Sequence, residues 1–179
     1  MANKELLNKV NEEHIKELTI LKLKRHLDII SKYEFNNKIK EFNVVYGSSD
    51  FVEDISIIAF RMILSKIEKM KKEDNIEIIF NELVNIRHDD FYIKRMCDVV
   101  LVGKNTIEVI KIIPLEINFI YAFEDLEIKL LGLGIIDKYL GKIDINNIKL
   151  TIVQPNLMMS SIYEIEIISF LHDLDLKLE

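Results

Sequence analysis

The stretch MCDVVLVGKNTIEVIKII, residues 96–113, decides how the rest of the chain is arranged. It contains two apolar, β-branched runs, Val99–Val102 and Ile107–Ile113, and such runs are typical of strands. Gly103-Lys104-Asn105 joins them, and this favours a hairpin because glycine and asparagine tolerate the positive φ angles of tight turns. Asp98 comes immediately before the first run. The stretch therefore predicts a β-hairpin with a carboxylate at its open end.

The composition predicts a single globular domain. The chain has 179 residues, of which 49% are hydrophobic and 30% charged, with only two prolines. A chain of this length buries roughly 70% of its unfolded surface around one core. We therefore expect one domain over residues 1–179.

The charge distribution disfavours nucleic acid as a partner. The formal net charge is −6, and no run of Lys or Arg is longer than Lys24-Arg25 or Lys71-Lys72. Phosphate neutralisation needs a clustered positive face. The C-terminal stretch has a single lysine, Lys177, and five acidic residues: Glu164, Glu166, Asp173, Asp175 and Glu179. Two interpretations stay open, a solvated acidic surface and a surface that docks onto a basic groove of a partner protein.

Cysteine usage and hydropathy predict a cytoplasmic protein. Cys97 is the only cysteine, so no internal disulfide can form. The four histidines lack a metal-ligand spacing, and His88-Asp89-Asp90 is more typical of a polar connection than of a metal site. The N-terminus lacks the apolar segment of a signal peptide, and no apolar run approaches the ~18 residues of a membrane span.

The spacing of apolar residues predicts an α/β fold with a mixed central β-sheet flanked by helices. Residues 34–46 are ambiguous and include a candidate strand at Phe42–Tyr46, whereas Asp50 and Glu53 form a capping-box pattern at the start of a helix. We expect a mainly helical part over residues 1–72 and an α/β core over residues 76–179. Besides the hairpin, the predicted helices are 3–31, 51–70, 122–140 and 169–178, and the predicted strands are 76–86, 148–153 and 163–167.

Several short blocks in the second half of the chain occur together in one known family. They are Cys97-Asp98, Glu124-Asp125-Leu126-Glu127, Leu131-Gly132-Leu133-Gly134, Thr151-Ile152-Val153-Gln154-Pro155-Asn156 and Tyr163-Glu164-Ile165. Through these blocks residues 95–170 resemble a phage-encoded family of RecB-like nucleases in the PD-(D/E)XK superfamily. The resemblance implies a restriction-endonuclease-like core.

The resemblance also implies that catalysis has been lost. In this superfamily two carboxylates on adjacent strands hold a divalent metal ion, and a lysine two residues beyond the second acid helps to activate the attacking water. Asp98 matches the first acid, but Lys111 stands at the second acid and Ile113 at the lysine. In the helical Gln-x-x-x-Tyr element, Glu127 and Leu131 replace glutamine and tyrosine. We therefore expect no catalytic residue, metal ion or other cofactor, and a salt bridge between Asp98 and Lys111.

Nearby acids offer an alternative. Glu108 has the opposite strand parity to Lys111, so it should face away from Asp98. A site rearranged from Asp98, Glu116 and Glu127 would bind Mg²⁺ or Mn²⁺ and make the protein a weak DNA nuclease.

The favoured hypothesis is a phage-derived pseudoenzyme that binds a protein partner. That partner would be an effector of host nuclease-based defence, inhibited as an anti-CRISPR protein would inhibit it. The alternatives are the weak nuclease and a non-catalytic accessory of phage DNA replication or recombination. The sequence leaves the target and the oligomeric state open.

Overall fold

The computed structural model describes residues 2–47, 49–88 and 91–178. In this part of the chain three helices precede a sheet of five strands, with further helices between and after the strands. The elements in chain order are α1 (Ala2–His26), α2 (Lys32–Tyr46), α3 (Asp50–Glu73), β1 (Glu77–His88), β2 (Phe91–Val102), β3 (Thr106–Ile112), α4 (Leu126–Tyr139), β4 (Asn147–Gln154), the short 3₁₀ helix η1 (Pro155–Leu157), β5 (Met159–Glu166) and α5 (Ile167–Leu178).

The strands form one mixed sheet in the order β1-β2-β3-β4-β5. β1, β2 and β3 pair antiparallel, β3 and β4 pair parallel, and β5 returns antiparallel beside β4. A parallel pair needs a crossover connection, and the segment 113–146, which contains α4, supplies it. The predicted α/β class with a mixed sheet is confirmed.

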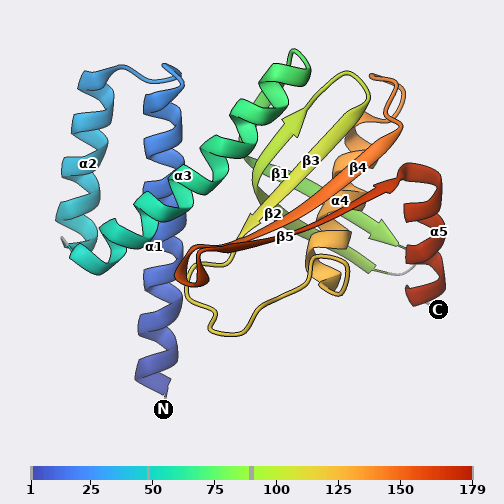
Figure 1. Cartoon of the computed structure of the whole chain (residues 1–179). Helices are drawn as coiled ribbons and strands as arrows, with labels where there is room; N and C mark the ends of the chain where they lie inside the picture. Colours follow the sequence, from blue (N-terminus) through green and yellow to red (C-terminus); the bar gives the residue numbers. More distant parts are fainter. Residues whose placement is uncertain (1, 48, 89–90, 179) are drawn as a thin grey trace.

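The helices cover both faces of this sheet (Figure 1). α3 and the C-terminal part of α1 pack on one face, which we call the α3 face; its cluster joins Leu23 and Ile63 to Ile110. α4 and α5 pack on the other, which we call the α4 face, where Leu131 and Phe170 are buried. A smaller apolar cluster joins α1, α2 and α3 to one another.

Polar side chains define where three helices begin. Ser31 accepts a hydrogen bond from the Glu34 N–H at 3.1 Å at the start of α2. Ser49, one residue before the predicted Asp50, caps α3. Asp125 caps α4 by accepting the Ile128 N–H at 2.7 Å. Each cap satisfies an amide that has no partner inside its own helix.

The β1–β2 ribbon is kinked at Asn81 and Asp98. The ladder pairs residues 80 with 99 and 82 with 97 but omits the pair between them, and Asn81 has a φ of +56°. Asparagine is one of the few residues that adopt this left-handed conformation readily. Ile79 and Val100 face α4 on one side of the kink, and on the other side Val84 and Cys97 do so. In both strands, therefore, the alternation of side chains between the α3 face and the α4 face shifts by one residue at the kink.

Five predicted elements need correction. The first helix ends at His26 and not at residue 31, and Asp28 after it adopts a left-handed φ of +56°. Phe42–Tyr46 is not a strand but the last part of α2, because Phe42 and Ile39 pack together at helical spacing. β2 begins at Phe91, well before the predicted Val99, and β5 begins at Met159, before the predicted residue 163. α4 begins at Leu126, whereas the expected helix began at residue 122.

Among the described helices, none combines the length and the apolar character that crossing a bilayer requires.

Candidate functional site

The Asp98 carboxylate lies at the kink and is engaged by a backbone amide. Its Oδ2 accepts the Ile112 N–H at 2.6 Å and lies 3.8 Å from Lys16 Nζ of α1. The Asp98 side chain is 14% exposed. Burial raises the pKa of Asp98, and the nearby Lys16 ammonium and the Ile112 amide oppose that rise. Asp98 thus takes the place of a backbone acceptor at the end of the β2–β3 ladder.

Lys111 points to the α4 side and is held by two acids. Its Nζ lies 3.2 Å from both carboxylate oxygens of Asp125 and 2.6 Å from Oε2 of Glu127. The Lys111 and Asp125 side chains are 12% and 14% exposed, whereas Glu127 is 54% exposed. Since Asp125 also caps α4, one carboxylate joins the end of β3 to the start of the helix.

The predicted salt bridge between Asp98 and Lys111 is wrong. Continuing the β2–β3 register one step beyond the pair Val99–Ile110 would place the two residues opposite each other. The kink at Asp98 breaks the alternation on which that prediction depended, and the Asp98 carboxylate bonds to the Ile112 amide and Lys16 instead.

The other predicted positions do not converge on a metal site. Ile113 packs at the edge of the α4-face cluster, and Leu131 is buried within it at 2% exposure. Glu116 accepts the amides of residues 117 and 118, which lowers the pKa of its carboxyl. Within the ranges that the structure covers, no three His, Cys, Asp or Glu side chains lie close enough to hold an ion. His88-Asp89-Asp90 lies outside what the structure describes, except for the backbone of His88.

Glu108 lies on the α3 face, as its strand parity predicts. Its carboxylate is 4% exposed and accepts the Thr151 hydroxyl of β4 at 2.7 Å. Lys111, three residues later, faces α4. The two charged residues of β3 are therefore on opposite faces of the sheet.

The segment 113–125, which we call the crossover loop, is fastened to the sheet at several points. Gln154, fully buried in β4, accepts the Ile120 N–H at 2.9 Å and donates to the Asn118 carbonyl at 2.7 Å. Ser161 of β5 accepts the Ala122 N–H at 2.9 Å. Gln154 belongs to the sequence block Thr151–Pro155, and its role is to hold this loop.

The crossover loop presents aromatic rings at the surface. The ring centroids of Phe119 and Tyr121 are 4.9 Å apart, and those of Tyr121 and Phe123 are 5.5 Å apart. Tyr121 and Phe123 remain about half exposed, at 48% and 47%, and Ile117 is 75% exposed. No lysine or arginine occurs between residues 112 and 128, whereas four acids do. The loop is thus an ordered surface of apolar and acidic groups.

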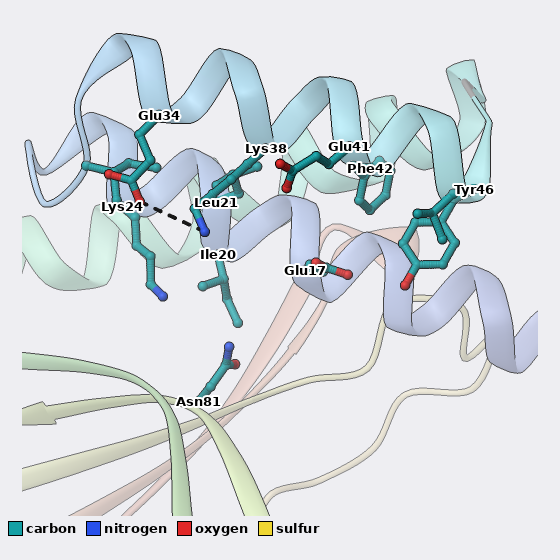
Figure 2. A pocket seen from close by; sticks show the side chains of 12 residues that line it. Glu17, Ile20, Leu21, Lys24, Glu34, Lys38, Glu41, Phe42, Tyr46 and Asn81 are labelled. Atoms are coloured by element: carbon teal, nitrogen blue, oxygen red, sulfur yellow. Dashed lines mark ion pairs between the residues drawn. The ribbon is translucent and has the colours of Figure 1, made fainter.

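A hollow of about 450 Å³ lies between α1 and α2 and reaches the kinked strand β1 (Figure 2). Ile20, Leu21 and Phe42 supply apolar lining, and Asn81 closes it from the sheet side. Its charges alternate in sign along the rim, with Glu34 and Lys38 paired at 3.9 Å. None of the charged side chains that line it is buried, so no fixed polar group defines a ligand class for this hollow.

The acidic C-terminal stretch is partly neutralised within the protein. Glu164 lies 3.2 Å from Lys149 Nζ, and Asp173 lies 3.0 Å from Lys129 Nζ. The Asp175 and Glu179 side chains lie outside the described part. Because two of its acids are paired with lysines of the same protein, this stretch offers less free negative charge to a basic partner than the sequence suggests.

Comparison with known proteins gives a family. Residues 13–175 match the family described as "Protein of unknown function (DUF2800)". The chain belongs to this family. No curated protein matches the sequence. A solved structure described as "Crystal structure of SSO0001" is 18% identical, with 100% of this chain and 88% of that chain covered, and its TM-score of 0.32 is too low to support a conclusion about fold or function.

Double-mutant cycles should separate the true partner of Lys111 from the predicted one. Combining Lys111→Met with Asp125→Asn, which retains a good helix cap, should give a coupling free energy of about 1–3 kcal/mol. Combining Lys111→Met with Asp98→Asn should give a clearly smaller coupling, because Lys111 acts on Asp98 only through its charge and makes no ion pair with it. Urea unfolding of the variants measures both values, and the reverse order would contradict the assignment.

The raised pKa of Asp98 predicts a pH dependence of stability. The folded protein holds this proton more tightly than the unfolded chain, so Asp98 makes stability fall as the pH rises from the ordinary carboxyl value of 3.8 through the raised folded value. Asp98→Asn keeps an acceptor for the Ile112 amide and removes the charge. The variant should therefore gain stability relative to the parent as the pH rises above the ordinary carboxyl value of 3.8, by up to about 1.4 kcal/mol per pH unit within the titration.

Exposed Asp137 of α4 provides the matched control. Asp137→Asn makes the same chemical change at the surface, away from Asp98 and Lys16. A difference between the parent and Asp98→Asn that stays flat across this range would show that Asp98 does not carry a raised pKa.

Proposed function

We propose that this protein is a nuclease-like pseudoenzyme that acts by binding another protein. The observation that carries the proposal is the Lys111 ammonium between Asp125 and Glu127, at the position where the resembling nucleases carry a metal-binding acid. The Lys111 ammonium lies 2.6 to 3.2 Å from the two carboxylates, offsets one of their two negative charges and repels a divalent ion.

The arrangement of the sheet supports the restriction-endonuclease-like core that we propose. An antiparallel β1–β2–β3 meander is followed by α4 and by β4 parallel to β3. Asp98 on β2 and Lys111 on β3 lie on adjacent strands, as the two acids of that core do. The N-terminal helices α3 and α1 cover the face opposite α4.

The crossover loop is the surface that we propose for the partner. Its backbone is fixed by Gln154 and Ser161, so its exposed rings lose little conformational entropy on binding. Rigid aromatic side chains dominate the energetics of many interfaces. Glu116 and Glu124, the two acids of this region that have no ion pair among the described residues, favour a basic surface on that partner and disfavour nucleic acid.

We propose a host defence effector as this partner. Nuclease-based effectors such as those of CRISPR systems have basic channels for nucleic acid, which the acidic and aromatic loop would complement. The protein would then be phage-derived and act in the bacterial cytoplasm as an inhibitor. No observation favours the weak nuclease, because Asp98, Glu116 and Glu127 are each engaged separately.

A metal-binding assay tests the loss of catalysis. Mn²⁺ should leave the melting temperature of the parent unchanged, and the parent should not cut single- or double-stranded DNA. The variant Lys111→Asp adds an acid beside Asp125 and Glu127 and should therefore bind Mn²⁺. At Mn²⁺ concentrations about ten to one hundred times the Kd of that variant for the ion, its free energy of unfolding should rise by about 1–3 kcal/mol. Lys111→Met is the control without an added acid. Mn²⁺-dependent cleavage by the parent that Asp98→Ala abolishes would overturn the proposal.

A binding assay tests the partner surface. The parent should bind a purified CRISPR effector nuclease from its bacterial host and inhibit target cleavage. The double variant Tyr121→Ser and Phe123→Ser should lose affinity by about tenfold or more, since both rings would be interface anchors. Tyr33→Ser, at a ring of α2 that is 77% exposed, is the matched control and should bind like the parent. Equal affinity of the parent and the loop variant would contradict the assignment of the crossover loop as the binding surface. Absence of binding to any effector of the host would contradict the proposal that the protein is an inhibitor of host defence.

A further inference from the structure

A polar pocket of about 400 Å³ lies on the α3 face of the sheet, opposite Lys111. The C-terminal half of α3, the turn between β2 and β3, and strands β3 to β5 surround it. Four lysines and four acids line it: Lys66, Lys69, Lys104 and Lys149, and Glu73, Asp74, Glu108 and Glu164. Its volume falls within the range of sites for small molecules.

A buried carboxylate lies at the sheet side of this pocket. Glu108 is 4% exposed, and the neighbouring positions of β3 on the same face are the fully buried Ile110 and Ile112. Among the described residues, only the Thr151 hydroxyl donates a hydrogen bond to Glu108, at 2.7 Å. An ionised carboxylate has about four acceptor sites on its two oxygens. Glu108 therefore retains acceptor capacity toward the pocket that it lines.

Ammonium groups converge on the same pocket. Lys149 is paired with Glu164 at 3.2 Å, but neither Lys66 nor Lys69 makes a hydrogen bond or ion pair with the described residues. Burial lowers the pKa of Lys66, and the nearby Lys149 and Lys69 lower it further, while Glu108 opposes them. Two unpaired cations thus stand at a pocket whose sheet side carries an acceptor.

We propose that this pocket binds a small phosphomonoester that carries hydroxyl groups, such as a sugar phosphate or a nucleoside monophosphate. The phosphate dianion would lie between Lys66 and Lys69, whose two charges it matches, and its arrival would relieve their mutual repulsion. A hydroxyl of the ligand would donate to Glu108. A simple anion such as inorganic phosphate would make no favourable contact with Glu108, and a neutral sugar would make no ion pair with the lysines. A phosphomonoester with hydroxyl groups makes both contacts.

This inference is independent of the proposed pseudoenzyme, because the pocket and Lys111 lie on opposite faces of the sheet. Isothermal titration calorimetry of the full chain with adenosine monophosphate, ribose 5-phosphate, inorganic phosphate and adenosine tests it. Ribose 5-phosphate or adenosine monophosphate should bind at least about tenfold more tightly than inorganic phosphate or adenosine. A higher affinity for the nucleotide than for the sugar phosphate would identify a base-binding contact, and equal affinities would identify the sugar phosphate as the recognised unit.

Three variants assign the contacts. Lys66→Met should weaken ligand binding by about tenfold or more, because it removes a partner of the phosphate. Lys69→Met should weaken it in the same direction and provides a second test if the first variant unfolds. Lys40→Met, at an exposed position of α2, removes the same charge away from the pocket and should bind like the parent.

Glu108→Gln tests the hydroxyl contact separately. It should reduce the preference for ribose 5-phosphate over inorganic phosphate, since removal of the negative charge favours the simple anion and weakens the acceptor. Inorganic phosphate binding as tightly as ribose 5-phosphate, equal losses in Lys66→Met and Lys40→Met, or no binding of any phosphomonoester at millimolar concentration would each overturn the proposal.

Discussion

The contact of Lys111 with Asp125 and Glu127 joins the only parallel strand pair of the described sheet to the helix that connects its two strands. The Asp125 carboxylate accepts hydrogen bonds from the Lys111 ammonium and from the Ile128 N–H of α4, so the helix start and the end of β3 are fixed together. Gln154 then fastens the crossover loop between them to β4. The position of the loop, and with it the exposed aromatic surface, depends on these polar contacts more than on apolar packing.

The kink at Asn81 and Asp98 gives the two strand-borne charges separate environments. Asp98 is served by the Ile112 amide and by Lys16, and Lys111 by acids of the crossover. Each charge therefore has its own partners among the side chains and amides of the protein. Burial raises the pKa of Asp98, and a divalent cation bound beside it would lower that pKa.

Much of the fold follows from local sequence signals, and the exceptions have physical causes. The β-branched runs of β3 and β4 and the parity of Glu108 predict the sheet core correctly, because both faces of those strands are buried. The first half of β2 has exposed polar positions, and its pairing with β1 supplies the stability that local composition does not. The Asp98–Lys111 pair was predicted wrongly because a reversal at one asparagine cannot be read from strand periodicity. Asp125 was missed as the partner of Lys111, although an aspartate before an apolar helical pattern is a cap signal.

A crystal structure of the parent protein grown with MnCl₂, with anomalous diffraction measured at the manganese edge, tests the central claim most directly. The account predicts density for the Lys111 ammonium between Asp125 and Glu127 and no anomalous peak within coordinating distance of Asp98, Asp125 or Glu127. An anomalous peak bound by those carboxylates, with the Lys111 side chain displaced from them, would contradict it.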